Sequence, residues 1–328
     1  MRAALASGLV LVCLCALHLR LGAIEIPMRT IARALVAYDP GQYDHVVVVR
    51  QRLTRLAVAL YAGASLSVSG LILQKILRNG LVSPSTLGIN AGATTAVVVA
   101  LFFFGVSGGL LFLPALAGAG LALGLSFAVA RLIEGQGERE LNLVLAGSMM
   151  SILFSSLTAF VLSLDPDAFA NVISWVIGDI GNFDHESLGA MAPLGAAGLA
   201  GALLLSRPID MLTLGREEAG AMGVDVPLIH GAALAAAVIL AVSAVVVVGP
   251  IGFLGLILPH VARLCVGEIG RLPVWICAAG GAATLVAADI LARVILAPQV
   301  LNVGTVMGLA GGAVFLGLVL SRMRGRRA

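Results

Sequence analysis

The sequence contains few charged residues and a single lysine. Charged side chains make up 11% of the 328 residues, and apolar side chains make up 60%. A soluble domain is usually about 25% charged and about 45–50% apolar. A chain of this composition lacks the polar surface that a water-soluble globule of its size needs. We therefore predict an all-α, polytopic membrane protein that forms one transmembrane domain over residues 1–328.

Motifs of nucleotide, hydrolytic and metal chemistry are also missing. The lysine, Lys75, follows Gln74, so the Gly-Lys-Ser/Thr of a phosphate-binding loop does not occur. There is no His-Glu-x-x-His and no Gly-x-Ser-x-Gly, and the four cysteines lack zinc or redox spacing. We expect no catalytic residue, no metal site, no cofactor bound by this chain and no nucleic-acid partner.

Apolar runs of about 20 residues, the length that crosses a bilayer, recur about ten times. We read the first run as a retained span, because we see no convincing signal-peptide cleavage site before Arg20 and further spans follow. The eighth run is interrupted by Pro250 and Pro259. The runs cover residues 3–23, 54–76, 86–105, 109–132, 141–163, 187–206, 228–248, 251–267, 273–296 and 303–321.

The distribution of basic residues in the short loops favours cytoplasmic N- and C-termini. Residues 24–53 and 164–186 then face outward, with a β-type run at His45–Val49 and a short surface or re-entrant helix in residues 171–184. One outward cluster, Arg50, Arg52 and Arg55, violates the rule. The charged stretch of about residues 207–227 faces the cytoplasm.

Ionisable residues inside the predicted spans are rare. Of the 17 acidic residues, only Asp289 lies well within a span, and Arg293 follows four residues later on the same helix face. We interpret the two as a structural pair, with a proton relay as the alternative. A gradient-driven carrier usually keeps ionisable groups in the middle of the membrane. Because such groups are rare here, a gradient-driven carrier is the less favoured function. The energy is expected to enter through the charged cytoplasmic stretch.

That cytoplasmic stretch predicts two short helical pieces with turns at Gly215 and Gly223. Glu217 and Glu218 come early in the second piece, where the helix dipole favours acids. Small residues around Gly220 offer a slim surface for another protein's groove, whereas an ordinary solvated loop is the alternative. The candidate contact residues are Leu214, Gly215, Glu217, Glu218, Ala219, Gly220, Met222 and Gly223.

Several motifs in order resemble the FecCD-type permeases, the membrane subunits of ABC importers for iron–siderophore complexes, haem and cobalamin. The resemblance extends from about residue 45 to 320. The motifs are Arg52-Leu53-Thr54-Arg55, Arg78-Asn79-Gly80-Leu81-Val82-Ser83-Pro84, Leu214 to Gly223, Gly249 to Arg263, and Ala288-Asp289-x-x-Ala292-Arg293.

The resemblance implies a type II ABC importer permease in the bacterial cytoplasmic (inner) membrane. A second permease subunit, identical or related, would complete the path. Two ABC ATPase subunits, which bind ATP and Mg, would act on residues 207–227 as coupling helices. A periplasmic or lipoprotein binding protein would dock on Arg52, Arg55 and Arg293. Structural or gating roles would fall to Asn79, Pro84, Gly249, Pro250, Pro259, His260, Arg263 and Asp289.

The sequence departs from the family pattern at four positions where proline is usual: Thr54, Gly80, Asn302 and Ala313. Because proline sets backbone shape, the local turn geometry there is open. Arg216 stands where an acid is common, which alters the charge of the expected ATPase contact. The cargo is expected to be an iron–siderophore complex, with haem or cobalamin as alternatives.

Overall fold

The computed structural model describes residues 2–22, 24–133, 139–167, 169–181 and 185–325. Within these ranges the regular structure is helical and contains no strand. The helices are α1 (Arg2–Arg20), α2 (Met28–Val36), α3 (Tyr43–Val46), α4 (Leu53–Ile76), α5 (Ile89–Phe104), α6 (Phe112–Leu132), α7 (Arg139–Leu164), α8 (Ala170–Ile177), α9 (His185–Leu204), α10 (Ser206–Leu212), α11 (Arg216–Ala221), α12 (Val226–Val248), α13 (Leu254–Val266), α14 (Leu272–Val294) and α15 (Val303–Gly325).

The lengths of these helices match a polytopic membrane protein. In the described part of the chain, 7 helical segments are long and apolar enough to cross a bilayer. Three shorter apolar helices, Ile89–Phe104, Leu254–Val266 and Val303–Gly317, fall on the remaining predicted runs. The all-α membrane fold is confirmed, and ten is an approximate count because α5 and α13, of 16 and 13 residues, are shorter than a full span.

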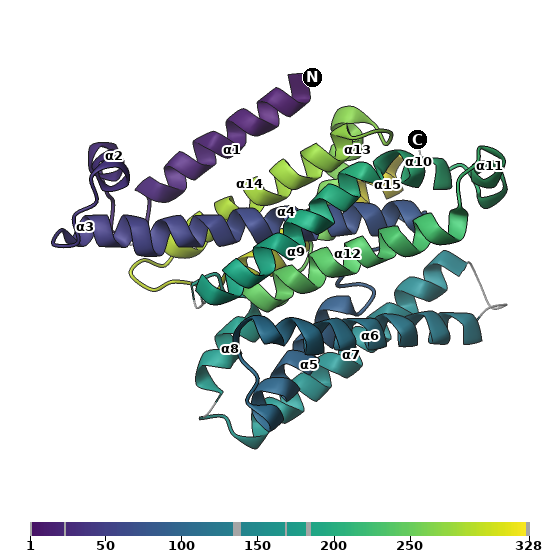
Figure 1. The fold of residues 1–328 in the computed structure, drawn as a ribbon, viewed down its shortest axis with the longest axis horizontal. Helices are drawn as coiled ribbons and strands as arrows, with labels where there is room; N and C mark the ends of the chain where they lie inside the picture. Colours follow the sequence, from purple (N-terminus) through teal and green to yellow (C-terminus); the bar gives the residue numbers. More distant parts are fainter. Residues whose placement is uncertain (1, 23, 134–138, 168, 182–184, 326–328) are drawn as a thin grey trace.

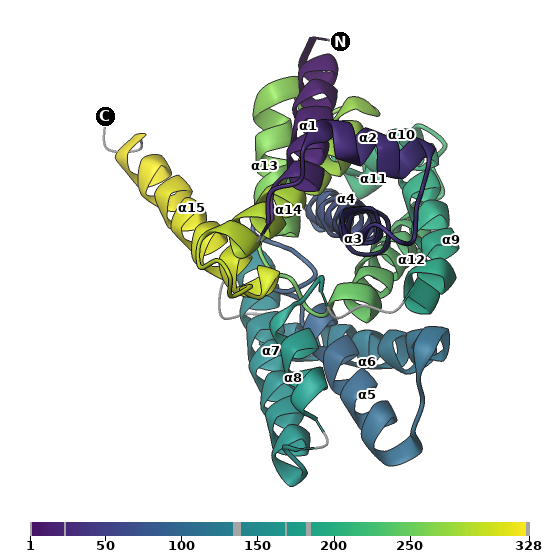
Figure 2. The same ribbon diagram turned by 90° about the vertical axis from the view of Figure 1, so that its left-hand side faces the viewer.

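Helix α4 forms the centre of the larger of two helix groups (Figures 1 and 2). It packs against α9, α12, α13 and α14. A Cβ built on Gly63 would lie 2.4 Å from the carbonyl oxygen of Gly281 in α14, and one on Gly70 would lie 2.0 Å from that of Gly255 in α13. Helices in lipid gain stability from such close backbone contact, so the glycines let α4 and its neighbours pack as one unit.

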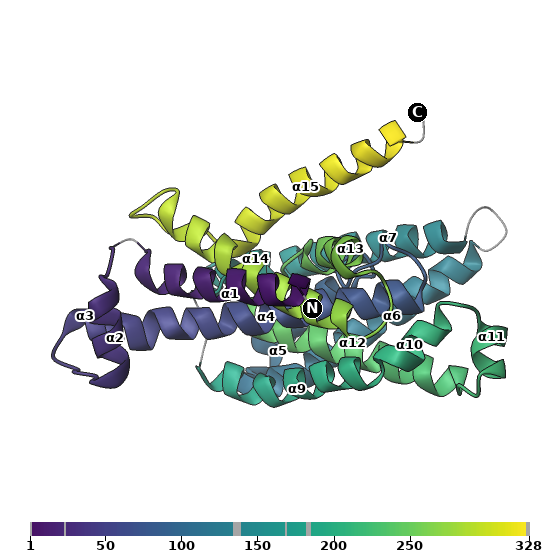
Figure 3. The ribbon, with the colours of Figure 1, turned by 90° about the horizontal axis from the view of Figure 1, so that it is seen from above.

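The second group consists of α5, α6 and α7, which pack against one another, with α8 beside them (Figure 2). Helix α12 contacts both α4 and the α5–α6 pair, and therefore joins the two groups. Helix α15 packs against α13 and α14 and then projects away from the rest of the molecule (Figure 3). The elongated molecule thus has two opposite ends, one carrying α2 and α3 and the other carrying α10 and α11 (Figure 1).

The expected β-type run at His45–Val49 is wrong. This segment is helical: α3 leads into a π-helical turn, Val47–Arg52, which continues into α4. Strand propensity of valine mainly reflects how its side chain packs. Here Val48 is buried with Ile26, Ile31 and Ala34, the latter two from α2. Packing against α2 therefore overrides the local preference and extends the second span to Tyr43–Ile76.

The expected short helix between the fifth and sixth runs is present as α8. The helix ends at Ile177, and the carbonyl oxygen of the next residue, Gly178, accepts a hydrogen bond of 2.8 Å from the backbone N–H of Gly304. Gly249, at φ 74°, follows α12, and a Cβ built there would lie 1.9 Å from the carbonyl oxygen of Trp175. Helix α8 is thus held against the end of α12 and the start of α15; residues 182–184 of the predicted tract lie outside the described residues.

Candidate functional site

The charged stretch forms a separate feature at one end of the molecule. Helices α10 and α11 are joined by a turn at Gly215, and a second turn at Gly223 leads into α12. Gly215 and Gly223 have φ values of 152° and 83°, which glycine adopts without a Cβ penalty. The two predicted helical pieces and both turns are confirmed. We call residues 207–227, the stretch expected to carry the coupling helices, the coupling segment.

The coupling segment exposes apolar side chains on either side of a small residue. Leu214 is 63% exposed and Met222 is 48% exposed. A Cβ built on Gly220, between them in the sequence, meets no atom within 4 Å. Ala219, which we expected to share this slim surface, is instead completely buried in the main core. It therefore anchors α11, whereas Gly220, Leu214 and Met222 are exposed.

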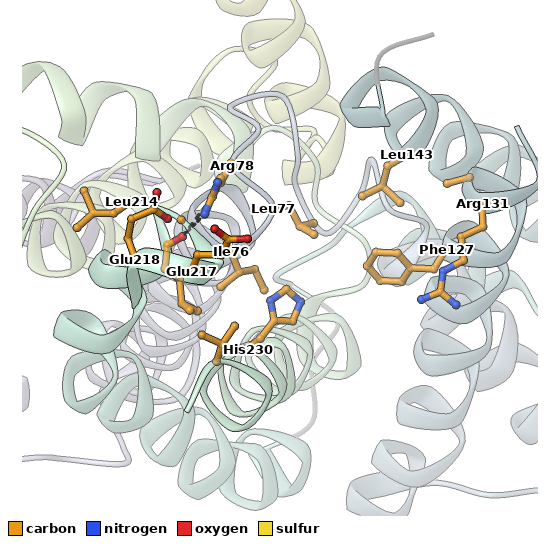
Figure 4. Close-up of a pocket in the computed structure, with 14 residues that line it drawn as sticks. Ile76, Leu77, Arg78, Phe127, Arg131, Leu143, Leu214, Glu217, Glu218 and His230 are labelled. Carbon is orange, nitrogen blue, oxygen red and sulfur yellow. Dashed lines mark hydrogen bonds between the residues drawn. The ribbon is translucent and has the colours of Figure 1, made fainter. Parts of the chain in front are cut away.

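A cavity of about 750 Å³ lies beside the coupling segment (Figure 4). Arg78, Leu214, Glu217, Glu218 and His230 line one side, and residues of α6 and α7 line the other. Glu217 and Glu218 are exposed, so two acids and two arginines, Arg78 and Arg131, line this opening together with apolar groups. The labelled residues of the opposite side are Phe127, Arg131 and Leu143.

The turn after α4 holds the coupling segment in place. The guanidinium of Arg78 donates hydrogen bonds of 3.2 and 2.7 Å to the carbonyl oxygen of Leu212. Arg78 itself has φ 51°, an uncommon value for a non-glycine residue. Asn79 is nearly buried and accepts a hydrogen bond of 2.8 Å from the backbone N–H of Leu81. The predicted structural role of Asn79 is consistent with this turn-closing contact.

Two motifs that lie far apart in the sequence meet beside this turn. A Cβ built on Gly255 would lie 2.9 Å from the ring of Pro84. The side chain of Arg263 donates to Gln74 over 3.0 Å, and the amide of Gln74 donates to the carbonyl oxygens of Gly255 and Leu256 in α13. These contacts tie α13 to the end of α4. The other residues of the Gly249–Arg263 motif flank or belong to α13. Gly249 and Pro250 precede the helix, and Pro259 and His260 lie within it.

A buried ionic cluster occupies the opposite end, between α1, α4 and α14. Asp289 is completely buried, and its carboxylate lies 3.0 Å from Arg293, 2.5 Å from Arg55 and 2.7 Å from the imidazole of His18. The contact predicted between Asp289 and Arg293 is present. It belongs to a four-residue cluster, so the expected isolated pair is incomplete.

The arginines of this end are satisfied largely by backbone. Arg52 is 5% exposed and donates to the carbonyl oxygens of Leu19, Arg20 and Ile24. Arg293 donates over 3.0 Å to the carbonyl oxygen of Leu21. These carbonyls lie in the last turn of α1 or in the four residues after it, where helices leave acceptors without partners. Two of the basic residues that violate the positive-inside rule, Arg52 and Arg55, therefore have partners inside the chain.

Arg52, Arg55 and Arg293 also border a cavity of about 200 Å³, together with Asp44. The structure thus brings the three residues of the expected docking site together, although Arg52 and Arg293 are buried. Their docking role stays a prediction.

Sequence reasoning missed His18, Gln74 and the ion pair between Lys75 and Asp210. An ionisable residue within an apolar run is costly and is therefore functional or paired. The position of His18 in the first apolar run was thus enough to mark it as a candidate. Its partner could not be identified, because Asp289 is 271 residues away in the sequence.

The fold and these features define a class: a membrane-embedded transport subunit with a coupling segment at one end and an arginine-rich cluster at the other. Comparison with known proteins gives the family. The model of the FecCD transport family matches residues 9–321. The chain belongs to this family and is a permease of the ABC importer type, as its motifs predicted.

Similar proteins of known description are iron-chelate permeases. The chain is 37% identical to the ferric enterobactin transport system permease protein FepD of Escherichia coli K12, over 97% of this chain and 94% of the relative. It is 35% identical to the Fe(3+) dicitrate transport system permease protein FecD of the same organism, with 94% of each covered. It is 35% identical to the "probable siderophore transport system permease protein YfiZ" of Bacillus subtilis, over 88% of this chain and 86% of the relative.

Solved structures agree with the fold. The structure described as "an inward-facing conformation of a putative metal-chelate type ABC transporter" has a TM-score of 0.78 at 26% identity, over 97% of this chain and 98% of that chain. The structure of PsaBC from Streptococcus pneumoniae in complex with Fab has a TM-score of 0.61 at 16% identity, over 87% and 94%, which supports the fold alone.

Proposed function

We propose that this chain is the transmembrane permease subunit of an ATP-driven importer that moves an iron–siderophore complex across the cytoplasmic membrane. The observation that carries the proposal is the coupling segment, which exposes Leu214 and Met222 around Gly220 at one end of a membrane-spanning bundle. Exposed apolar groups rimmed by polar residues mark protein–protein contacts. The relatives named for enterobactin, dicitrate and siderophore transport support an iron chelate as cargo.

The proposed partners follow from this arrangement. Two ABC ATPase subunits, with ATP and Mg, contact the coupling segments of two permease subunits that enclose one path. Closure of the ATPase dimer moves these segments as rigid bodies and switches the gates. The α10–α11 end then faces the cytoplasm. The start of α1 and the end of α15 lie away from the α2–α3 end, which fits the expected cytoplasmic location of both termini (Figure 1).

A periplasmic or lipoprotein binding protein docks at the α2–α3 end in this proposal. Arg52, Arg55 and Arg293 border the cavity there, and the carboxylates of Asp289 and Asp44 face them. Three positive charges against two negative charges leave a positive excess that favours acids on the partner. Charge complementarity of this kind fixes register and speeds encounter more than it adds affinity.

A gradient-driven carrier is the contrasting function. The buried carboxylate of Asp289 is engaged by Arg55, Arg293 and His18, an arrangement that favours a fixed structural charge over a proton-exchanging one. The test is uptake into proteoliposomes that hold the permease with or without its ATPase. Uptake that needs ATP and the ATPase supports the proposal, whereas uptake driven by an ion gradient through the permease alone refutes it.

A further inference from the structure

A second buried ion pair ties the coupling segment to the membrane-spanning bundle. The carboxylate of Asp210, in α10, lies 2.5 Å from the ammonium of Lys75, near the end of α4. The side chains of Asp210 and Lys75 are 9% and 10% exposed. Ion pairs that are this buried are screened by salt far less than exposed ones. Lys75 is also the single lysine of the chain.

The same carboxylate holds a third element. Its second oxygen accepts a hydrogen bond of 2.5 Å from the backbone N–H of Gly270, which lies just before α14. Asp210 therefore links the coupling segment to the end of α4 through one oxygen and to the start of α14 through the other. Because both bonds involve an ionised acceptor, they are among the stronger hydrogen bonds in proteins.

Helices α4 and α14 form a continuous connection between the two ends of the molecule. They approach closely at Gly63 and Gly281. At the far end they are joined by the ion pair between Arg55 and Asp289. Arg55 and Lys75 are separated by 20 residues of α4, or about 30 Å at the rise of an α-helix. The pair of helices is thus fastened at both ends, by Asp210 at one and by Asp289 at the other.

We propose that Asp210 is the positioning residue that transmits movement of the coupling segment to the α4–α14 pair and, through it, to the arginine cluster at the opposite end. The inference rests on the proposed function, since it takes an ATPase to be what moves the coupling segment. A displacement of α10 pulls on the ends of two helices at once. Because those helices pack as a unit, the Arg55–Asp289 end must move with them.

The variant that tests this role is Asp210→Asn, which keeps the shape of the side chain and removes its charge. The matched control is Glu268→Gln. Glu268 lies in the same loop as Gly270, but it is 69% exposed and 3.8 Å from Arg263. Each permease is reconstituted with its ATPase and binding protein. Two quantities are measured: the iron chelate taken up per ATP hydrolysed, and the stimulation of hydrolysis by the loaded binding protein.

We expect Asp210→Asn to co-purify with the ATPase but to lower both quantities by about tenfold, within the range of typical coupling free energies. Glu268→Gln should match the wild type. Wild-type values for Asp210→Asn would overturn the inference. So would a lower yield of folded protein with an unchanged ratio of uptake to hydrolysis, because that pattern describes a purely structural link. A wild-type permease that binds no ATPase refutes the proposed function instead.

Variants of Lys75 decide the matter if Asp210→Asn does not accumulate. Lys75→Met removes the charge on the α4 side, whereas Lys75→Arg keeps it. The inference predicts about a tenfold lower ratio for Lys75→Met and a near-normal ratio for Lys75→Arg. Equal ratios in the two variants contradict it. In the exchanged pair, Lys75→Asp with Asp210→Lys, the link to α4 returns but the acceptor for Gly270 does not, so only partial recovery is expected.

Discussion

Replacement of Asp289 by asparagine removes the one carboxylate that serves three partners, His18, Arg55 and Arg293. Arg55 and Arg293 would keep their charges, and Arg293 would keep its bond to the carbonyl oxygen of Leu21. Removing one partner of a buried ion pair costs about 3–5 kcal/mol, because the remaining charge is left uncompensated. We expect Asp289→Asn to fall in this range and to be more destabilising than either single arginine change.

The four-residue cluster changes what the compensating variants should do. If Asp289 and Arg293 formed an isolated pair, Asp289→Asn with Arg293→Gln would restore most of the stability. Because Arg55 also binds this carboxylate, the double variant should remain destabilised. The triple variant that also carries Arg55→Gln should recover part of the lost stability. Neither arginine of the four-residue ionic cluster would then remain as a charge without its carboxylate.

The assay is the amount of monodisperse protein that survives heating in detergent, followed by size-exclusion chromatography. Glu25→Gln is the control, because Glu25 is 68% exposed and 3.9 Å from Arg20, and exposed ion pairs contribute about 0–1 kcal/mol. Asp289→Asn with the stability of Glu25→Gln would refute the reasoning. Full recovery in the double variant would show that Arg55 does not depend on Asp289.

Three further predictions concern packing, coupling and docking. Gly63→Ala should cost about 1–3 kcal/mol because its Cβ would lie 2.4 Å from the carbonyl oxygen of Gly281, whereas Gly120→Ala, with no atom within 4 Å, should be tolerated in the same heating assay. Gly220→Trp should leave the subunit folded but abolish ATP-dependent uptake, while Gly189→Trp, also unobstructed, should transport normally; normal uptake by Gly220→Trp would remove the coupling role. Arg55→Gln should weaken binding-protein association and reduce its dependence on salt, and an unchanged salt titration would argue against docking at this residue.

The spans could be predicted from the sequence because their signal is local. A run of about 20 apolar residues is sufficient to identify a bilayer-crossing helix, and the positions of α6, α12 and α14 follow from it. The segment His45–Val49 could not be read in this way. Its valines favour a strand locally, and only contact with α2, formed by residues earlier in the chain, makes the segment helical.

The candidate site was predictable where its residues are close in sequence. The turns at Gly215 and Gly223 and the spacing of Asp289 and Arg293 could be read directly. The partners of Arg52 could not, because they are backbone carbonyls at and just after the end of α1 rather than side chains. The contacts of Asp289 with His18 and of Lys75 with Asp210 join distant helices, so helix packing alone brings them together.

The most direct test of the central claim is uptake of radiolabelled iron–siderophores, haem and cobalamin by the permease reconstituted with its ATPase and binding protein. The account predicts that an iron–siderophore complex accumulates inside the vesicles only when ATP is supplied and that Gly220→Trp abolishes this accumulation. Uptake of haem or cobalamin without any iron–siderophore would contradict the proposed cargo. Uptake that continues without ATP would contradict the ATP-driven mechanism itself.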